Sequence, residues 1–318
     1  MSIYLNTTKP YENYIEIVNE EYFVDKSAMI SILNKKLSTK GKYVCITRPR
    51  RFGKSSAADM IGAYYSKAVN SKDIFDKLNI SSFKSYEENL NKYNVINISF
   101  NDISDKGSTY EDYIDMIRNS IKKDIKEKYP FINPDEYYNL SSMLRETKDK
   151  FIFIFDEWDY IFNNNLFEEN QNNFLEFLRN LLKDEPYVLL VYMTGVLPIK
   201  RYSSGSALNM FDEFTFLKDR QFAEYFGFTE EEKTELIHNF AVATTKENRE
   251  QFLKLFDSSK SKKNKDYEKE QKKIYKWYEK VDAEEIYFEC TGDEIYHDYW
   301  DREWVYDYTD KYKIQNQQ

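Results

Sequence analysis

The stretch at residues 48–55, Arg-Pro-Arg-Arg-Phe-Gly-Lys-Ser, constrains the fold of this chain more than any other. It follows an apolar run at residues 43–47 that predicts a strand, and it precedes residues 56–67, whose pattern predicts a helix. A strand, a loop ending in Gly-Lys-Ser and a helix together indicate a phosphate-binding loop. The N-terminus of such a helix stabilises an anion, because it presents unpaired N–H groups and the positive end of the helix dipole.

Three residues of this loop have a specific expected role. Gly53 allows the backbone to approach a phosphate closely, Lys54 would neutralise the outer phosphates, and the Ser55 hydroxyl suits Mg²⁺. The full pattern has Gly where Arg48 stands, and Gly-Lys-Ser also occurs by chance, so an ordinary turn before a helix is the alternative. The predicted nucleotide-binding residues are Arg48, Pro49, Arg50, Arg51, Phe52, Gly53, Lys54, Ser55 and Ser56.

A second motif, Phe-Ile-Phe-Ile-Phe-Asp-Glu-Trp-Asp, spans residues 151–159. Its five apolar residues predict a parallel strand that is buried on both faces. Asp156 then lies at the carboxyl end of that strand, where open α/β sheets bind ligands. We expect Asp156 to order the metal ion and Glu157 to polarise the attacking water, whereas Asp159 is expected to cap a following helical turn.

Two further apolar runs, at residues 95–100 and 187–194, also predict strands. Thr194 ends the second run and is a candidate contact to the outer phosphate or the water; a plain strand end before Gly195 is the alternative. The run at 95–100 lies between the loop and the Asp-Glu motif, which favours the hydrolytic ATPase branch over the GTPase-type branch. The predicted fold is α/β: a P-loop NTPase with a mostly parallel, doubly wound sheet and flanking helices.

Several arginines could stabilise negative charge at the outer phosphate. Arg50 and Arg51 flank the loop, although ion pairs with neighbouring acidic helices are the alternative for both. Arg201 and Arg220 follow the strand at 187–194 and are candidate sensor arginines. The catalytic candidates are therefore Glu157, Lys54, Thr194 and Arg201.

Taken together, these motifs resemble the AAA-ATPase-like family of P-loop proteins, whose members often carry a PD-(D/E)XK-type nuclease domain after the ATPase. The resemblance covers about residues 20–235 and is carried by residues 22–27, 47–55, 155–159, 194–199, 204–209 and 222–232. It implies ATP binding and Mg²⁺-dependent hydrolysis, and the missing first Gly of the loop is a trait of the family. Trp158 stands where the family usually has Tyr.

The nuclease part of the resemblance is weak. The segment Trp277-Tyr278-Glu279-Lys280 lacks the Gly and second Tyr of the family's Trp-Tyr-Asp-Gly-Tyr motif. Glu231-Glu232-Lys233 has the Glu-x-Lys spacing of a nuclease site, but we interpret it as a solvated helical turn. The C-terminal region is thus either a degenerate remnant or an unrelated module.

The chain divides into three expected parts. Residues 1–217 form the nucleotide-binding core, with a leader at 1–20, a helix at 23–37 capped by Asp25, and helices at 110–128 and 172–183. Residues 218–257 form a helical, lid-like region, and residues 258–318 form a charged linker and an acidic aromatic tail. A protein partner docking on the lid or tail is one expectation, and a solvated charged face is its alternative.

Composition limits the remaining classes. The net charge of −9 disfavours broad nucleic-acid binding, although a lysine-rich run at residues 260–280 leaves it open. No apolar run approaches the roughly 20 residues that span a bilayer, and no signal peptide is expected. Cys45 lies in a predicted buried strand, so no disulfide with Cys290 and an intracellular, cytoplasmic location are expected. Two histidines are too few for a zinc site.

Three functions are compatible with the sequence. The first is an ATPase whose hydrolysis drives a conformational change, and Glu157 favours it because a pure binder needs no such carboxylate. The second is a nucleotide-gated switch or scaffold that does not hydrolyse ATP. The third is a nucleic-acid-acting protein related to the nuclease-linked ATPases. The oligomeric state is left open.

Overall fold

The computed structural model describes residues 2–20, 23–103, 109–196, 198–202, 207–215, 221–229 and 232. These residues belong to one compact unit, Met1–Leu236. Most of the expected lid-like region and the whole charged linker and acidic tail lie outside the described residues.

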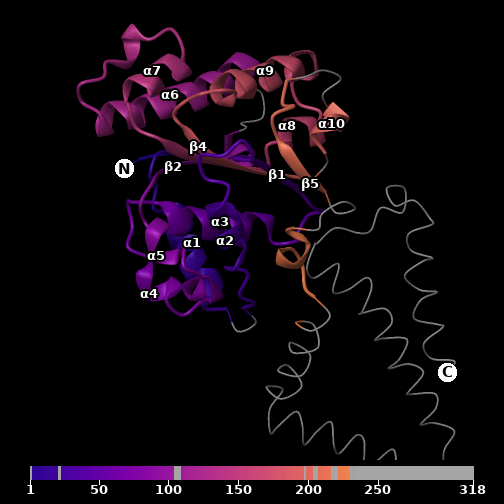
Figure 1. The fold of residues 1–318 in the computed structure, drawn as a ribbon. Coiled ribbons are helices and arrows are strands. Elements are labelled where there is room, and N and C mark those ends of the chain that lie inside the picture. Colours follow the sequence, from indigo (N-terminus) through magenta and orange to yellow (C-terminus); the bar gives the residue numbers. More distant parts are fainter. Residues whose placement is uncertain are drawn as a thin grey trace, which may run out of the picture. The chain divides into compact units, whose positions relative to one another are not determined.

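A parallel sheet of five strands forms the centre of this unit (Figure 1). The strand order is β2-β3-β4-β1-β5, and each neighbouring pair is parallel. This confirms the predicted α/β fold. The strands are β1 (Tyr43–Thr47), β2 (Asn94–Ser99), β3 (Phe151–Asp156), β4 (Val188–Gly195) and β5 (Asp212–Thr215).

Helices cover both faces of the sheet (Figure 1). One face carries α1 (Lys9–Val18), α2 (Met29–Asn34), α3 (Lys54–Tyr65), α4 (Lys72–Phe75) and α5 (Tyr86–Asn89). The other carries α6 (Tyr110–Lys128), α7 (Leu140–Glu146), α8 (Tyr160–Asn163), α9 (Gln171–Leu182) and α10 (Ile199–Tyr202). Short 3₁₀ turns include η1 (Asn79–Ser82), η2 (Phe100–Ile103), η3 (Pro134–Glu136), η4 (Glu168–Asn170) and η5 (Ala223–Tyr225).

Two hydrophobic cores result from this layering, because successive side chains of a strand point to opposite faces of the sheet. In β3, Phe153 and Phe155 pack into the core under α6 and α9, while Ile152 and Ile154 pack into the core with α2 and α3. Every residue of β3 is buried. A strand of this kind has no polar face, and this is why its sequence reads as a continuous apolar run.

The predicted strands agree with the structure to within one residue at each end. The helix at residues 110–128 is α6, and the helix at 172–183 is α9, displaced by one residue. β5, α1 and α7 were not predicted. β5 has the sequence Asp-Glu-Phe-Thr and lies at the edge of the sheet, where none of its four residues is fully buried. Its sequence therefore lacks the apolar run that predicts a buried strand.

Residues 1–20, expected as a leader, contribute to the core. α1 packs against α3, and Leu5 bridges Ile96 of β2. The carboxylate of Asp124 in α6 is fully buried and accepts hydrogen bonds from the backbone N–H groups of Ile3, Tyr4 and Leu5 at 2.6–3.0 Å. This carboxylate therefore holds the N-terminal segment on the sheet.

The helix predicted at residues 23–37 is wrong in length, since α2 covers six residues, Met29–Asn34. Its N-cap residue is Ala28, and Asp25 does not cap it. The Asp25 carboxylate instead accepts from the N–H of Ser27 at 2.8 Å and from the N–H of Asn79 at 2.5 Å. Asp25 thus stabilises a turn and the start of η1, a contact across 54 residues that no local pattern encodes.

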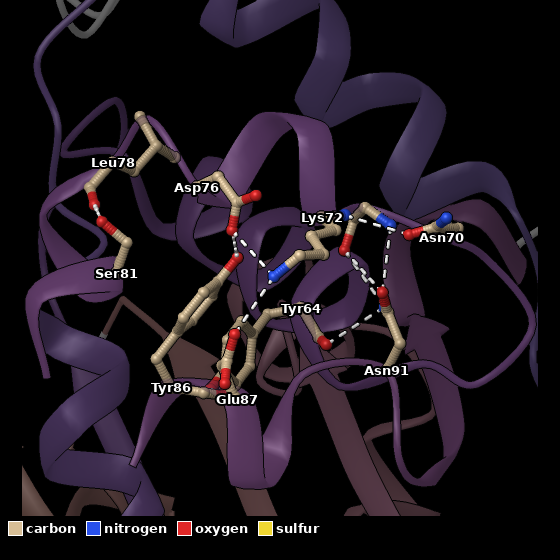
Figure 2. A network of polar contacts seen from close by, with 10 residues as sticks. Tyr64, Asn70, Lys72, Asp76, Leu78, Ser81, Tyr86, Glu87 and Asn91 are labelled. Carbon is tan, nitrogen blue, oxygen red and sulfur yellow. Dashed lines mark hydrogen bonds and ion pairs between the residues drawn. The ribbon is translucent and has the colours of Figure 1, made fainter. Parts of the chain in front are cut away.

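The end of α3 is held by a polar network centred on Asn91 (Figure 2). Asn91 has a left-handed backbone, with φ of 56°, and its amide nitrogen donates to the carbonyls of Ala63, Tyr64 and Ser66 at 3.0–3.2 Å. Ala63 and Tyr64 belong to the last turn of α3, and Ser66 is its C-cap residue, so these carbonyls lack helical partners. Its amide oxygen accepts from the N–H of Ser71 at 3.0 Å. Nearby, Lys72 pairs with Asp76 and Glu87 (Figure 2).

Replacing Asn91 with Ala is expected to lower the free energy of unfolding by about 1–3 kcal/mol, because the carbonyl of Ser66 loses its side-chain donor. The carbonyls of Ala63 and Tyr64 keep one donor each, the Ser71 hydroxyl and the backbone N–H of residue 91. Asn91→Gly, which tolerates the left-handed backbone, isolates the side-chain contribution. Urea unfolding measures both. Asn70→Ala is the matched control, since Asn70 is exposed and accepts one long bond, 3.3 Å, from the N–H of Lys72. Equal stabilities of the Asn91→Gly and wild-type proteins would contradict a capping role.

Candidate functional site

The loop between β1 and α3 has the shape of an anion-binding turn. β1 ends at Thr47, and α3 begins at Lys54. Gly53 is the N-cap residue of α3 with φ of 75°, a left-handed conformation in which a side chain is strained. The N-terminus of α3 therefore faces the loop with its positive dipole end, as a bound phosphate requires.

Lys54 folds back over this loop. Its ammonium donates to the carbonyls of Arg48 at 3.0 Å and Pro49 at 2.7 Å, and its side chain is buried. Burial lowers the pKa of Lys54, while the charges of Asp156, Asp159 and Glu157 act in the opposite direction. The lysine is thus positioned inside the curve of the loop by loop carbonyls.

Ser55, Asp156 and Thr194 form one hydrogen-bonded set. The Ser55 hydroxyl donates to one oxygen of Asp156 at 2.5 Å, and the Thr194 hydroxyl donates to the other. They come from α3 and from the ends of the adjacent strands β3 and β4. Thr194 is fully buried, and its hydroxyl is directed at Asp156; its expected contact with phosphate or water stays a prediction.

Glu157 follows Asp156 directly and has a left-handed backbone with φ of 50°. Its N–H lies 3.4 Å from the Thr194 hydroxyl, and Trp158 N–H donates to the Thr194 carbonyl at 3.1 Å. The pKa of Glu157 is raised, first by burial and then by the charge of Asp156, while Lys54 and Arg50 partly offset this. Glu157 is therefore a half-buried carboxyl within electrostatic range of the loop cations.

Asp159 lies at the N-cap position of α8, as predicted, but makes no side-chain capping bond there. Its carboxylate instead accepts from the N–H of Val196 at 2.8 Å, which ties the end of β3 to the end of β4. A Cβ at Gly195 would lie 2.5 Å from Nε1 of Trp158. The indole therefore requires glycine at this position.

Arg48, one of the predicted nucleotide-binding residues, has a buried side chain. It is 2% exposed, and its guanidinium donates to the carbonyls of Thr47 and Phe214, both at 2.8 Å. The guanidinium also lies 5.1 Å from the ring centre of Phe226. Arg48 therefore links β1 to β5 and to the segment at residues 221–229 inside the protein, and its predicted contact with a nucleotide stays a prediction.

The other candidates fall into three groups. Arg50 and Arg51 are exposed on the loop, and Phe52 is half-buried beside Gly227. Arg201 lies in α10, but its side chain is outside the described part of the structure. Arg220 is outside the described residues altogether.

A polar cavity of about 240 Å³ opens beside Ser55 and Asp156. Its wall includes Asp59 of α3, whose carboxylate accepts from the amide of Asn13 in α1 at 3.1 Å. Burial, above all, raises the pKa of Asp59 to about 7. Asp59 was not among the predicted site residues; its spacing of four residues from Ser55, which puts both on one helix face, was the available signal.

The donor set fits Mg²⁺. Ser55 and Asp156 offer adjacent oxygen atoms at the edge of a polar cavity. Among the described residues, no group of three or more His, Cys, Asp or Glu side chains could enclose a metal ion. Mg²⁺ suits such a site, because it is bound through few protein oxygens and takes water and phosphate oxygens as its other ligands.

The match to a protein-family model agrees with this geometry. The family model described as predicted AAA-ATPase matches residues 10–203. No match was found among curated proteins. PCH-2 from C. elegans is similar at 14% identity and a TM-score of 0.28, with 65% of this chain and 42% of that chain covered. Within the described residues, no helix is long and apolar enough to cross a membrane. This family model matches more than half of the chain's 318 residues. The chain therefore belongs to the AAA-ATPase-like family of predicted AAA-ATPases.

Proposed function

We propose that this protein binds ATP with Mg²⁺ at the loop of residues 48–55 and hydrolyses it to drive a conformational change. The main support is the set of Ser55, Asp156 and Thr194, joined by hydrogen bonds at the carboxyl ends of adjacent parallel strands. Family membership supports ATPase-type nucleotide binding independently. Binding at this edge also fits the general location of ligand sites in open α/β sheets.

Each residue has a role in this proposal. The N-terminal N–H groups of α3 and the Lys54 ammonium bind the phosphates. Ser55 and Asp156 hold Mg²⁺, which when bound neutralises charge on the phosphate oxygens. Glu157 orients a water molecule and takes its proton as the water oxygen bonds to the γ-phosphorus. The bond from that phosphorus to the bridging oxygen breaks, and ADP and inorganic phosphate are released.

Removal of the Lys54 ammonium tests the proposal. Lys54→Ala is expected to reduce phosphate release by at least about 100-fold, because preorganised charge at the transferring phosphoryl group is lost. Phosphate release with saturating Mg²⁺ and ATP, and the affinity for a fluorescent ATP analogue, are measured on the full chain. Lys35→Ala is the control, since Lys35 is exposed beyond the end of α2.

Two results would contradict the proposal. ATP binding without turnover by the wild-type protein would replace hydrolysis with a nucleotide-gated switch. Absence of ATP binding would remove the nucleotide site itself.

A further inference from the structure

Asp59 shares a helix face with Ser55. The two residues are one turn apart in α3, so their side chains project to the same side. Both line the polar cavity of about 240 Å³ that also reaches Asp156. Asp59 therefore lies on the wall of the space into which the oxygens of Ser55 and Asp156 open.

The wall of this cavity is polar on several sides. α1 contributes Asn13, whose amide nitrogen donates to Asp59 at 3.1 Å. The end of β2 and the start of η2 contribute Asn97, Ser99 and Asn101, with the Ser99 hydroxyl donating to Asn101 at 2.6 Å. Such a lining suits water molecules, which need several polar partners each.

The hydrogen bond from Asn13 does not by itself account for a carboxylate here. α1 already lies tightly against α3, because a Cβ at Gly62 would come 2.7 Å from Pro10. An amide at position 59 could accept the bond from Asn13 equally well. Burial raises the pKa of Asp59 most, the bond from Asn13 and the charge of Lys9 partly offset this, and the charge of Asp156 adds to it, so the carboxylate carries a net cost in this half-buried place.

Mg²⁺ would explain that cost. The ion dehydrates reluctantly, so an ion bound by Ser55 and Asp156 brings water molecules into the adjoining space. A carboxylate that accepts hydrogen bonds from metal-bound water orients it and strengthens binding.

We propose that Asp59 is a positioning residue of the site, whose carboxylate accepts hydrogen bonds from water bound to the Mg²⁺ that Ser55 and Asp156 hold. This inference rests on the proposed function. In this proposal, Asp59 does not touch the nucleotide; it acts on the site through the water molecules bound to Mg²⁺.

Two variants separate this role from a structural one. Asp59→Asn keeps the shape and the bond with Asn13 but removes the charge. Asn13→Ala removes that bond but keeps the carboxylate. Mn²⁺ serves as the probe: its affinity for the full-length protein with saturating ADP is measured by electron paramagnetic resonance, and ADP affinity is measured separately in EDTA.

Asp59→Asn is expected to weaken Mn²⁺ binding by about 10-fold or more, the usual effect of losing a partner of a metal ligand shell. ADP affinity in EDTA should be unchanged, and Asn13→Ala should bind Mn²⁺ as the wild type does. Asp59→Ser, a smaller residue without charge, should behave like Asp59→Asn and provides a second test of the charge.

The outcomes distinguish this inference from the function on which it rests. If Asp59→Asn binds Mn²⁺ as tightly as the wild type, or if Asn13→Ala loses as much affinity, the inference is overturned while the ATPase proposal stands. If the wild-type protein with ADP binds no Mn²⁺, both are overturned together.

Discussion

Replacing Glu157 with Gln is expected to reduce ATP turnover by about 10²–10⁴-fold, the usual contribution of a general base. Gln has nearly the same shape but cannot accept the proton of the attacking water. ATP affinity should remain close to that of the wild type, because the predicted phosphate contacts come from the loop and α3. The turnover rate is measured by phosphate release and the ATP affinity by nucleotide binding, both on the same preparation of each protein.

The pH dependence of turnover provides a further check on Glu157. Its pKa is raised by burial and by Asp156, and the active form of a general base is the deprotonated one. As the pH is lowered, turnover is therefore expected to fall as Glu157 becomes protonated. The midpoint of this loss should lie at a higher pH than it would if the base were an exposed glutamate. Glu168→Gln is the control, since Glu168 is exposed in η4. If the Glu157→Gln variant hydrolyses ATP as fast as the wild-type protein, Glu157 is not the general base and another group takes the proton.

Replacing Asp124 with Ala is expected to lower the free energy of unfolding by about 3–5 kcal/mol. The buried carboxylate accepts from three consecutive backbone N–H groups, and its loss leaves these donors without their charged partner. Asp124→Asn retains one acceptor oxygen and should fall between Asp124→Ala and the wild type. Urea unfolding measures all three proteins.

The same helix offers a matched control for Asp124. Asp115 is exposed in α6 and pairs with Arg118 at 3.2 Å, an (i, i+3) pair. Asp115→Ala is expected to change the free energy of unfolding by no more than about 0.5 kcal/mol. Similar losses for Asp115→Ala and Asp124→Ala would show that the N-terminal segment is not held by the buried carboxylate.

The central elements could be predicted because their signals are local. β1, β3 and β4 are buried on both faces and therefore appear as unbroken apolar runs. α6 has a regular apolar face and a Thr109 capping box, and both its ends were predicted. The length of α2 was mispredicted for the opposite reason: the turn before it depends on Asp25 bonding to Asn79, a distant residue.

Within the site, the sequence by itself determined where the phosphate loop and the Asp-Glu motif lie and that the chain is ATPase-like. A phosphate loop and its carboxylate follow local patterns of strand, turn and helix, and such patterns can be recognised in a sequence. Tertiary structure alone decided the surroundings of three residues. The Arg48 side chain points inward to β5 and Phe226, Thr194 is bonded to Asp156, and Asp59 lines a cavity whose wall includes residues of α1. The physical reason is that burial and hydrogen-bond partners arise when distant segments pack, and a linear pattern does not contain that information.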